Sequence, residues 1–336
     1  MWHVEVRTPT YRRPVLLERA LKSLISQTHP HWRCIVLDDE PGGRQAREVC
    51  ARLADQRIIY RPNARNLGVG PNIDAAFSRA PLPGSTHACV LEDDNYYLPD
   101  FMAANLSVMT EQHVDIVLRN PLIEKATVPN GEGTIVPGSV YEGQFVDGIV
   151  SQEELWATYF FAPTTPFSLP AASNANLFWR LARGLSFSTL RFTDDPVFQE
   201  HLRTLCLDRP AYVAMDPKVV WRNNGAESLR PRLSGLSFWL AHIRWLYRQR
   251  ILYRQVYRHL CQRGAVDCVW HNRFRQVDAA CERAFWKVGI KPPVASQFSR
   301  RERAILIAKG ELARLIGILV AEPTKYRIGT SRVESV

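Results

Sequence analysis

The residues with the clearest chemical potential form the segment Glu92-Asp93-Asp94-Asn95, which directly follows an apolar run at residues 87–91. Adjacent carboxylates repel one another unless a cation or strong hydrogen-bond donors lie between them. Hard oxygen ligands suit Mg²⁺ or Mn²⁺, ions that bridge a few carboxylates to substrate phosphates. The segment therefore predicts a metal and phosphate site. The structural alternative is a solvated turn that caps a helix beginning near Pro99.

Two earlier strands are also predicted to end in polar residues. The first contains Val4 and Val6 and reaches Thr8-Pro9-Thr10-Tyr11, and the second, 33–37, is followed by Asp38-Asp39-Glu40. Between them, helical spacing predicts a buried face made of Leu16, Leu17, Ala20, Leu21, Leu24 and Ile25, with Pro14 in the first turn. A third strand, 57–60, leads through a loop to a helix at 72–80. This alternation predicts a parallel, helix-covered sheet whose polar strand ends share one edge.

These motifs, in this order, resemble family 2 of the inverting, nucleotide-sugar-dependent glycosyltransferases. The matching segments are Thr8–Pro14, Leu21–Leu24 with Gln27-Thr28, Trp32–Asp39, Asn66–Gly68 with Asn72, and Glu92–Asn95 with Leu98–Asp100. The resemblance is specific over residues 1–110 and continues more weakly to residue 228. It implies an α/β fold of GT-A type, a Rossmann-like mixed sheet flanked by helices, and leaves a C-terminal helical extension.

The resemblance implies a nucleotide site at the first two strand ends. Thr10 and Tyr11 would face the nucleobase, and Asp38 or Asp39 would accept a hydrogen bond from a base N–H such as that of uracil. Arg65 is a predicted donor to the base or the diphosphate, because an arginine fork matches phosphate oxygens. A solvated loop arginine is an equally good interpretation of Arg65.

The resemblance assigns the metal to the acidic segment. Asp94 would be the main ligand of Mn²⁺ or Mg²⁺, and Asp93 would support it or contact the ribose. The cation would neutralise the diphosphate as it leaves. Glu92 is not expected to be a ligand.

Inversion also needs a base on the face of the sugar opposite the leaving group. In the family, this base is an aspartate in a second acidic motif, and Thr193-Asp194-Asp195-Pro196 is the matching segment here. Asp195 aligns best by its spacing to the apolar residues that follow, and Asp194 stays open as the alternative. An acid before a proline is also a common helix start, which is compatible with holding a base.

The segment 111–228 is the predicted acceptor half. Asn130-Gly131-Glu132-Gly133 lies between two apolar stretches and predicts a hairpin or flap. Asn174 and Trp221 are predicted acceptor contacts. Relatives often carry a histidine near Trp221 that helps to hold the metal or diphosphate, whereas this chain has Asn224.

Charge is distributed unevenly along the chain, whose formal net charge is +10. Residues 229–266 contain eight arginines and no acidic residue, interleaved with tryptophan and tyrosine. Such a basic, aromatic-rich helix suits an anionic membrane surface. The alternatives are an ordinary helix packed on the catalytic domain, or nucleic acid as the partner.

We expect two regions: a catalytic domain at 1–228, divided into a donor half at 1–110 and an acceptor half at 111–228, and a basic helical region at 229–336. The predicted function is metal-dependent, inverting transfer of a sugar, UDP-linked by expectation, to a hydroxyl of a glycan or lipid-linked acceptor. A sugar transferase acting on nucleic acid and a non-catalytic nucleotide-binding scaffold are the alternatives. Seven cysteines without a CxxC pair favour a cytoplasmic location. The basic segment 229–266 adds the expectation of a peripheral position at the inner face of a membrane.

Overall fold

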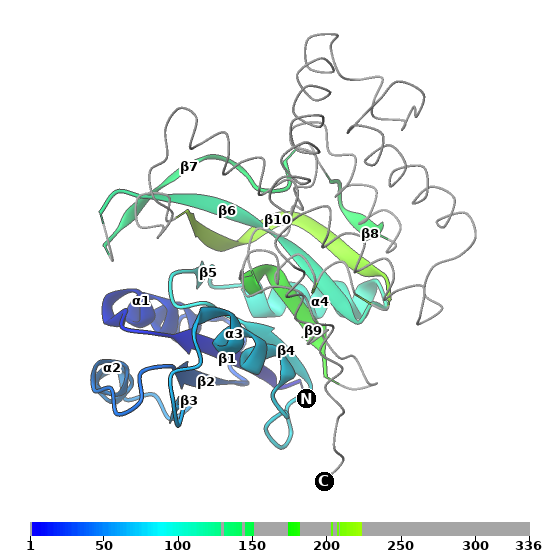
Figure 1. Ribbon diagram of the computed structural model, residues 1–336. Coiled ribbons are helices and arrows are strands. Elements are labelled where there is room, and N and C mark those ends of the chain that lie inside the picture. The colour runs from blue at the N-terminus through cyan, green and yellow to red at the C-terminus, as the bar shows by residue number, and fades with distance from the viewer. Residues whose placement is uncertain are drawn as a thin grey trace, which may run out of the picture. The chain divides into compact units, whose positions relative to one another are not determined.

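The structure of the chain is a computed structural model that describes residues 2–128, 131–142, 145–150, 174–181, 203, 207 and 209–223. The chain divides into two compact units, of which the first comprises residues 1–152, 170–189 and 207–229. All helices and strands labelled in Figure 1 belong to this first unit. The predicted division at residue 228 stays a prediction.

The described strands form one sheet in the order β3-β2-β1-β4-β9-β6-β10-β5, with β7 paired to β6 and β8 to β10. The bounds are Val4–Thr10 (β1), Trp32–Asp38 (β2), Ile58–Pro62 (β3), His87–Val90 (β4), Tyr96–Tyr97 (β5), Ile116–Ala126 (β6), Gly133–Ser139 (β7), Gly148–Val150 (β8), Leu177–Arg180 (β9) and Ala211–Asn223 (β10). Strands β3, β2, β1 and β4 are parallel, as are β6 and β10, whereas β9 runs antiparallel between β4 and β6. The predicted mixed α/β sheet is confirmed.

Helices are present where the sequence predicts them, beginning at Pro14 and near Pro99, and at 69–78 in place of the predicted 72–80, whereas the sequence does not predict the helix at 45–53. The helices are Pro14–Ile25 (α1), Gln45–Leu53 (α2), Val69–Ser78 (α3) and Phe101–Glu111 (α4), with a single 3₁₀ turn at Asn174–Asn176 (η1). Helix α1 begins with Pro14, whose fixed φ and missing N–H suit a first turn. Its buried face matches the prediction except at two positions: Ile25 is 36% exposed, and Ser23 is buried instead.

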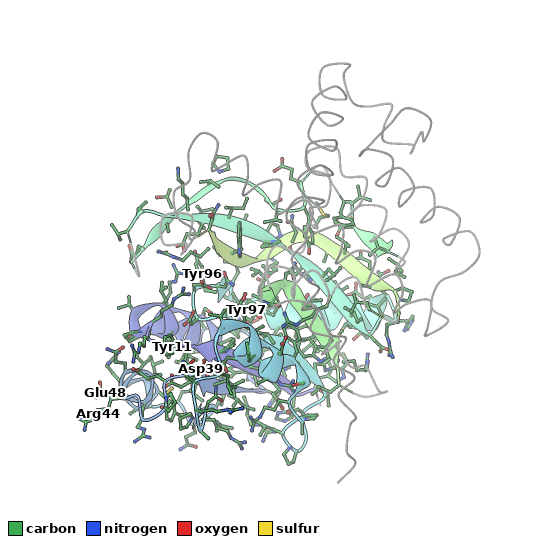
Figure 2. All side chains as sticks on the ribbon, in the orientation of Figure 1. Tyr11, Asp39, Arg44, Glu48, Tyr96 and Tyr97 are labelled. Atoms are coloured by element: carbon green, nitrogen blue, oxygen red, sulfur yellow. The ribbon has the colours of Figure 1, made fainter. Side chains whose placement is uncertain are left out.

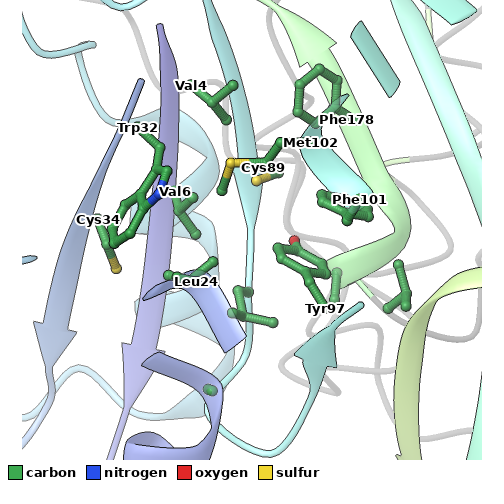
Figure 3. Close-up of a cluster of buried hydrophobic side chains, with 14 of the residues drawn as sticks. Val4, Val6, Leu24, Trp32, Cys34, Cys89, Tyr97, Phe101, Met102 and Phe178 are labelled. Carbon is green, nitrogen blue, oxygen red and sulfur yellow. The ribbon is translucent and has the colours of Figure 1, made fainter. Parts of the chain in front are cut away.

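The core joins the parallel strands to α4 and β9. Figure 3 shows this cluster, in which Cys89 of β4 lies near Met102 and Phe101 of α4. Tyr97 of β5 stacks on Phe101 with ring centroids 3.6 Å apart. Because Tyr97 lies two residues after the acidic segment, its burial anchors that segment to the core.

Two further expectations can be compared with the structure. The predicted hairpin is present, because β6 and β7 pair antiparallel from Ala126↔Gly133 to Leu122↔Ser139. Within the described part of the chain, no helix is both long enough and apolar enough to cross a membrane.

Candidate active site

The segment Glu92–Asn95 connects β4 to β5 at the carboxyl ends of the parallel strands. Before it, the Leu91 N–H donates to the Arg7 carbonyl of β1 at 3.0 Å. After it, the hydroxyl of buried Tyr97 donates to the Val90 carbonyl at 3.0 Å. The segment is therefore fixed at both ends, so the carboxylates are held at the sheet edge by the packing around them.

Asp93 points back toward β1. Its Oδ2 accepts a hydrogen bond from the Thr10 hydroxyl at 2.8 Å, and the residue is only 5% exposed. Burial and the neighbouring Asp94 charge raise the pKa of Asp93 to about 7, although Arg13 and Thr10 act in the opposite direction. A carboxylate in this position needs positive charge beside it in order to ionise.

Arg13 supplies such a charge. Its Nη1 lies 3.3 Å from Asp93 Oδ1 and 2.9 Å from Asp94 Oδ2, and its side chain is 38% exposed. Two hard carboxylate oxygens thus converge on one cationic atom at a partly open position. This donor set fits Mn²⁺ or Mg²⁺ bound by few protein oxygens and completed by substrate phosphate. Within the described residues, no group of three or more His, Cys, Asp or Glu side chains could hold a metal by itself.

Glu92 lies on the other side of the turn. Its two carboxylate oxygens accept hydrogen bonds from the Asn95 and Asn174 side-chain amides, each at 2.8 Å. The expectation that Glu92 is not a metal ligand stays a prediction. Asn174 is buried, and its predicted contact with an acceptor stays a prediction.

Asp39 organises the loop that precedes α3. Its carboxylate accepts from the Asn63 amide and from the Leu67 and Gly68 main-chain N–H groups, all at 2.8 Å. Gly68 has φ +85°, a conformation that glycine adopts without a steric penalty. The Asp39 N–H donates to the Thr10 carbonyl at 2.9 Å, which joins the ends of β1 and β2.

Asp38 is held differently. It accepts from the Tyr60 hydroxyl at 2.9 Å and from the Glu40 N–H at 3.1 Å. Burial raises its pKa. Both aspartates are buried.

Tyr11 is the exposed aromatic side chain at this edge, with 41% of its surface accessible. Figure 2 shows it near Asp39, beside the ends of β1 and β2. The Arg12 guanidinium lies 5.0 Å from the Tyr11 ring centre and pairs with Glu40 at 2.6 Å. A planar ring beside fixed acceptors is a suitable platform for a nucleobase.

The remaining predicted residues are more scattered. Arg65 is exposed in the loop before α3, and no hydrogen bond or ion pair links it to the described part of the chain. Trp221 lies on β10 opposite Ile123 of β6 and is half-buried. Asp194, Asp195, Asn224 and residues 229–336 lie outside the described residues.

The sequence did not single out Arg13, Arg19, Glu124 or Arg222, which all contact the acidic turn or one another. Arg13 lies within the matching segment Thr8–Pro14. One signal was available for it: a basic residue directly before Pro14 must lie at the N-terminus of α1, beside the strand end. The other three come from distant parts of the chain and carry no local signal.

Comparison with known proteins finds a similarity over part of the chain. Residues 6–147 match the family described as glycosyl transferase family 2. "Uncharacterized glycosyltransferase MJ1057" of Methanocaldococcus jannaschii is 29% identical over 118 residues, 34% of this chain and 39% of that protein. "Putative colanic acid biosynthesis glycosyl transferase WcaA" of Escherichia coli K12 is 27% identical over 138 residues, 41% of this chain and 47% of that protein. The matched stretch thus spans less than half the length of either relative.

A solved structure shows a similar trace. S. aureus TarS 1-349 in complex with UDP-GlcNAc superimposes with a TM-score of 0.48 at 15% identity, over 75% of this chain and 66% of that chain. The family match covers all three polar strand ends, which the fold brings to one edge. Residues 6–147 therefore resemble a glycosyl transferase family 2 domain, and this match covers less than half of the chain.

Proposed function

We propose that the chain is a metal-dependent, inverting glycosyltransferase that uses a UDP-linked sugar. The observation that carries this proposal is the convergence of Asp93 and Asp94 on one cationic position, beside Thr10 at the end of β1. When bound there, Mn²⁺ or Mg²⁺ supplies Lewis-acid neutralisation of the leaving diphosphate. Asp94 is the more open of the two aspartates and acts as the main ligand, with Asp93 in support.

The nucleoside binds along the ends of β1 and β2. Tyr11 is accessible for stacking on the base. Asp38, which is paired in register with Thr10 at the end of β2, is the proposed acceptor for a base N–H. Asp39 acts mainly through the loop, because three donors already occupy its carboxylate. Arg65 lies at the exposed end of that loop and supplies a cation for the base or the diphosphate.

Proton removal from the acceptor hydroxyl is assigned to Asp195, with Asp194 as the alternative. The acceptor is a hydroxyl of a glycan or of a lipid-linked glycan, with Asn174 and Trp221 as predicted contacts. The arginine-rich segment 229–266 supports contact with an anionic membrane at the cytoplasmic face, because no acidic residue balances its charge.

A thermal-shift screen of nucleotide sugars with and without Mn²⁺ tests the donor and the metal. Binding to the folded state raises apparent stability by mass action. We expect UDP-sugars with Mn²⁺ to give the largest shift. A shift by another nucleotide replaces the UDP assignment, and an equal shift with EDTA removes the metal from the proposal.

Asp195→Asn separates an enzyme from a non-catalytic scaffold. Catalysis predicts that the variant binds the donor like the wild type and loses transfer. Unchanged transfer in both Asp195→Asn and Asp194→Asn removes these residues as the base. Binding to anionic liposomes and to duplex DNA, at two salt concentrations, tests the partner of residues 229–266.

A further inference from the structure

A second charged cluster lies directly behind the acidic turn, and its centre is Glu124 of β6. This glutamate is 3% exposed. Its two oxygens lie 2.7 and 2.8 Å from Arg19 Nη1 of α1, and Oε2 lies 3.2 Å from Arg222 Nη1 of β10. Glu124 and Arg222 are direct cross-strand partners. One buried carboxylate therefore joins three elements that are distant in sequence.

Arg19 connects this cluster to the acidic turn. Its Nη2 donates to the main-chain carbonyl of Asp94 at 2.6 Å, while Nη1 stays on Glu124. The guanidinium also lies 4.7 Å from the ring centre of Tyr96, the residue after the turn. A planar guanidinium can hold two acceptors in fixed directions, which an ammonium group cannot do.

Arg222 connects the same carboxylate to the hairpin between β6 and β7. Its guanidinium donates to the carbonyls of Gly131 at 2.7 Å and Val128 at 3.0 Å. Its main-chain N–H donates to Asn95 Oδ1 at 2.9 Å, so β10 also holds the end of the acidic turn. The cluster thus contacts both the turn and the predicted flap.

Gly133 of β7 leaves space for the Glu124 side chain. A Cβ placed on Gly133 of β7 would lie 2.5 Å from Glu124 Cγ and 2.7 Å from the Lys125 carbonyl. A larger residue at position 133 would therefore displace either the carboxylate or the strand. Buried ion pairs are weak contributors to stability, because desolvation offsets their attraction. Their better-attested role is to fix one arrangement among several.

We propose that Glu124 is a positioning residue that acts through Arg19 on the Asp94 main chain and through Arg222 on the hairpin. It sets where the Asp93 and Asp94 carboxylates meet the cation and diphosphate, and it couples that position to the hairpin tip. This proposal deepens the proposed function and rests on it for the identity of the ligand.

Three variants test the coupling. Arg19→Lys keeps the charge that faces Glu124 and loses the second contact to the Asp94 carbonyl. Glu124→Gln keeps the size of the side chain and removes its charge. Glu18→Gln is the matched control, because Glu18 is the adjacent residue on α1 and, among the described residues, forms its ion pairs with Lys22 and Arg52, away from the turn.

The measurement is the calorimetric dissociation constant of UDP, and of GDP in parallel, with Mn²⁺ and with EDTA. Substitution of groups that orient metal ligands costs about 10- to 100-fold in metal affinity. We expect Arg19→Lys and Glu124→Gln to lose about tenfold or more of the Mn²⁺-dependent affinity, with little change in EDTA. Glu18→Gln behaves like the wild type. A purely structural role would weaken both affinities together, and that result overturns the proposal, as does wild-type behaviour of Arg19→Lys.

Amide hydrogen exchange gives a readout that does not depend on the ligand. If Glu124 couples the two segments, amides of residues 95–97 and 131–132 exchange faster in Glu124→Gln than in Glu18→Gln. Equal exchange overturns the coupling. If the wild type binds neither nucleotide with Mn²⁺, the proposed function fails while the exchange result still decides the coupling. If Glu124→Gln does not fold, the dissociation constants and the amide exchange rates are both measured on Arg19→Lys.

Discussion

Strands β1, β2 and β4 carry clusters of titratable residues at both ends. The two clusters differ in the side chains and main-chain groups that surround them. At the carboxyl end, Asp38, Asp39 and Asp93 are buried but surrounded by hydroxyl, N–H and guanidinium donors. At the amino end, His3, His31 and His87 precede or begin the same three strands. Their neighbours are largely other rings.

The histidine cluster is packed as a set of flat side chains. His3 and His31 have ring centroids 5.4 Å apart, and His87 stacks on Phe178 at 5.7 Å. Burial lowers the pKa of His87 to about 4. Grouping of similar titratable residues therefore does not by itself create a site. The carboxyl end differs because its carboxylates face hydroxyl, N–H and guanidinium donors at the edge where open α/β sheets bind ligands.

The largest effect is expected at the carboxyl end, from Asp94→Asn. The change removes the charge that faces Arg13 and, in the proposed function, the main metal ligand. We expect the transfer rate to fall about 10³-fold, which is typical when one preorganised electrostatic group is lost. The free energy of unfolding should change by less than about 1 kcal/mol, because Asp94 is partly exposed. Nucleotide release from the donor and urea unfolding measure the two quantities.

His29→Gln at the amino end is the control for this rate. His29 lies 5.7 Å from His31 between ring centroids and has no contact with the acidic turn. The variant should transfer sugar at the wild-type rate. An equal loss in both variants would mean that the two ends do not differ in function.

Asp39→Asn should separate loop building from catalysis within the carboxyl end. The carboxylate now accepts hydrogen bonds from the main-chain N–H groups of Leu67 and Gly68. An amide at this position would place its own N–H donor against one of these N–H groups. The mismatch should lower the free energy of unfolding by about 3 kcal/mol, since hydrogen bonds to buried charged groups are strong and costly to leave unmade. Urea unfolding checks this, with Asp74→Asn on α3 as the control. Wild-type stability would show that the loop does not depend on the charge.

The sequence predicted the carboxyl end better than the elements that support it. Strands β1, β2 and β4 are short apolar runs that end abruptly in polar residues, so both their existence and their shared edge follow from local pattern. The local pattern does not tell whether Asp38 or Asp39 organises the loop. The side chains of adjacent residues at a strand end point in different directions, and the direction of each is set by tertiary packing.

The support behind the turn depends on contacts that no local pattern encodes. Glu124 meets Arg19 and Arg222 across separations of 105 and 98 residues. Strand β9 has only four residues and inserts antiparallel between β4 and β6, a pairing set by tertiary packing. The predicted base, Asp195 or Asp194, stays a prediction.

His87, at the amino end of β4, should make the free energy of unfolding depend on pH. The folded-state pKa of His87 is about 4, below its ordinary value of 6.5, so the unfolded chain binds more protons between these values. Stability from this group is therefore complete above pH 6.5 and is lost as pH falls toward 4. We expect the wild type to lose about 2 kcal/mol more than His87→Phe between pH 7 and pH 4.5. Urea unfolding at both pH values measures the difference, and parallel curves would show that His87 titrates normally.

The smallest effect should come from Tyr60→Phe, which removes one neutral donor from a carboxyl-end aspartate. The Tyr60 hydroxyl donates to Asp38 at 2.9 Å, and burial already raises the pKa of this carboxyl. Losing one hydrogen bond of this kind should lower the free energy of unfolding by about 1 kcal/mol. Because ionised Asp38 then has fewer donors, the loss should be larger at pH 8 than at pH 5. Urea unfolding at the two pH values checks both points. A loss that does not depend on pH would mean that the Tyr60 hydrogen bond stabilises Asp38 equally at both pH values, so that the charge of Asp38 does not set its strength.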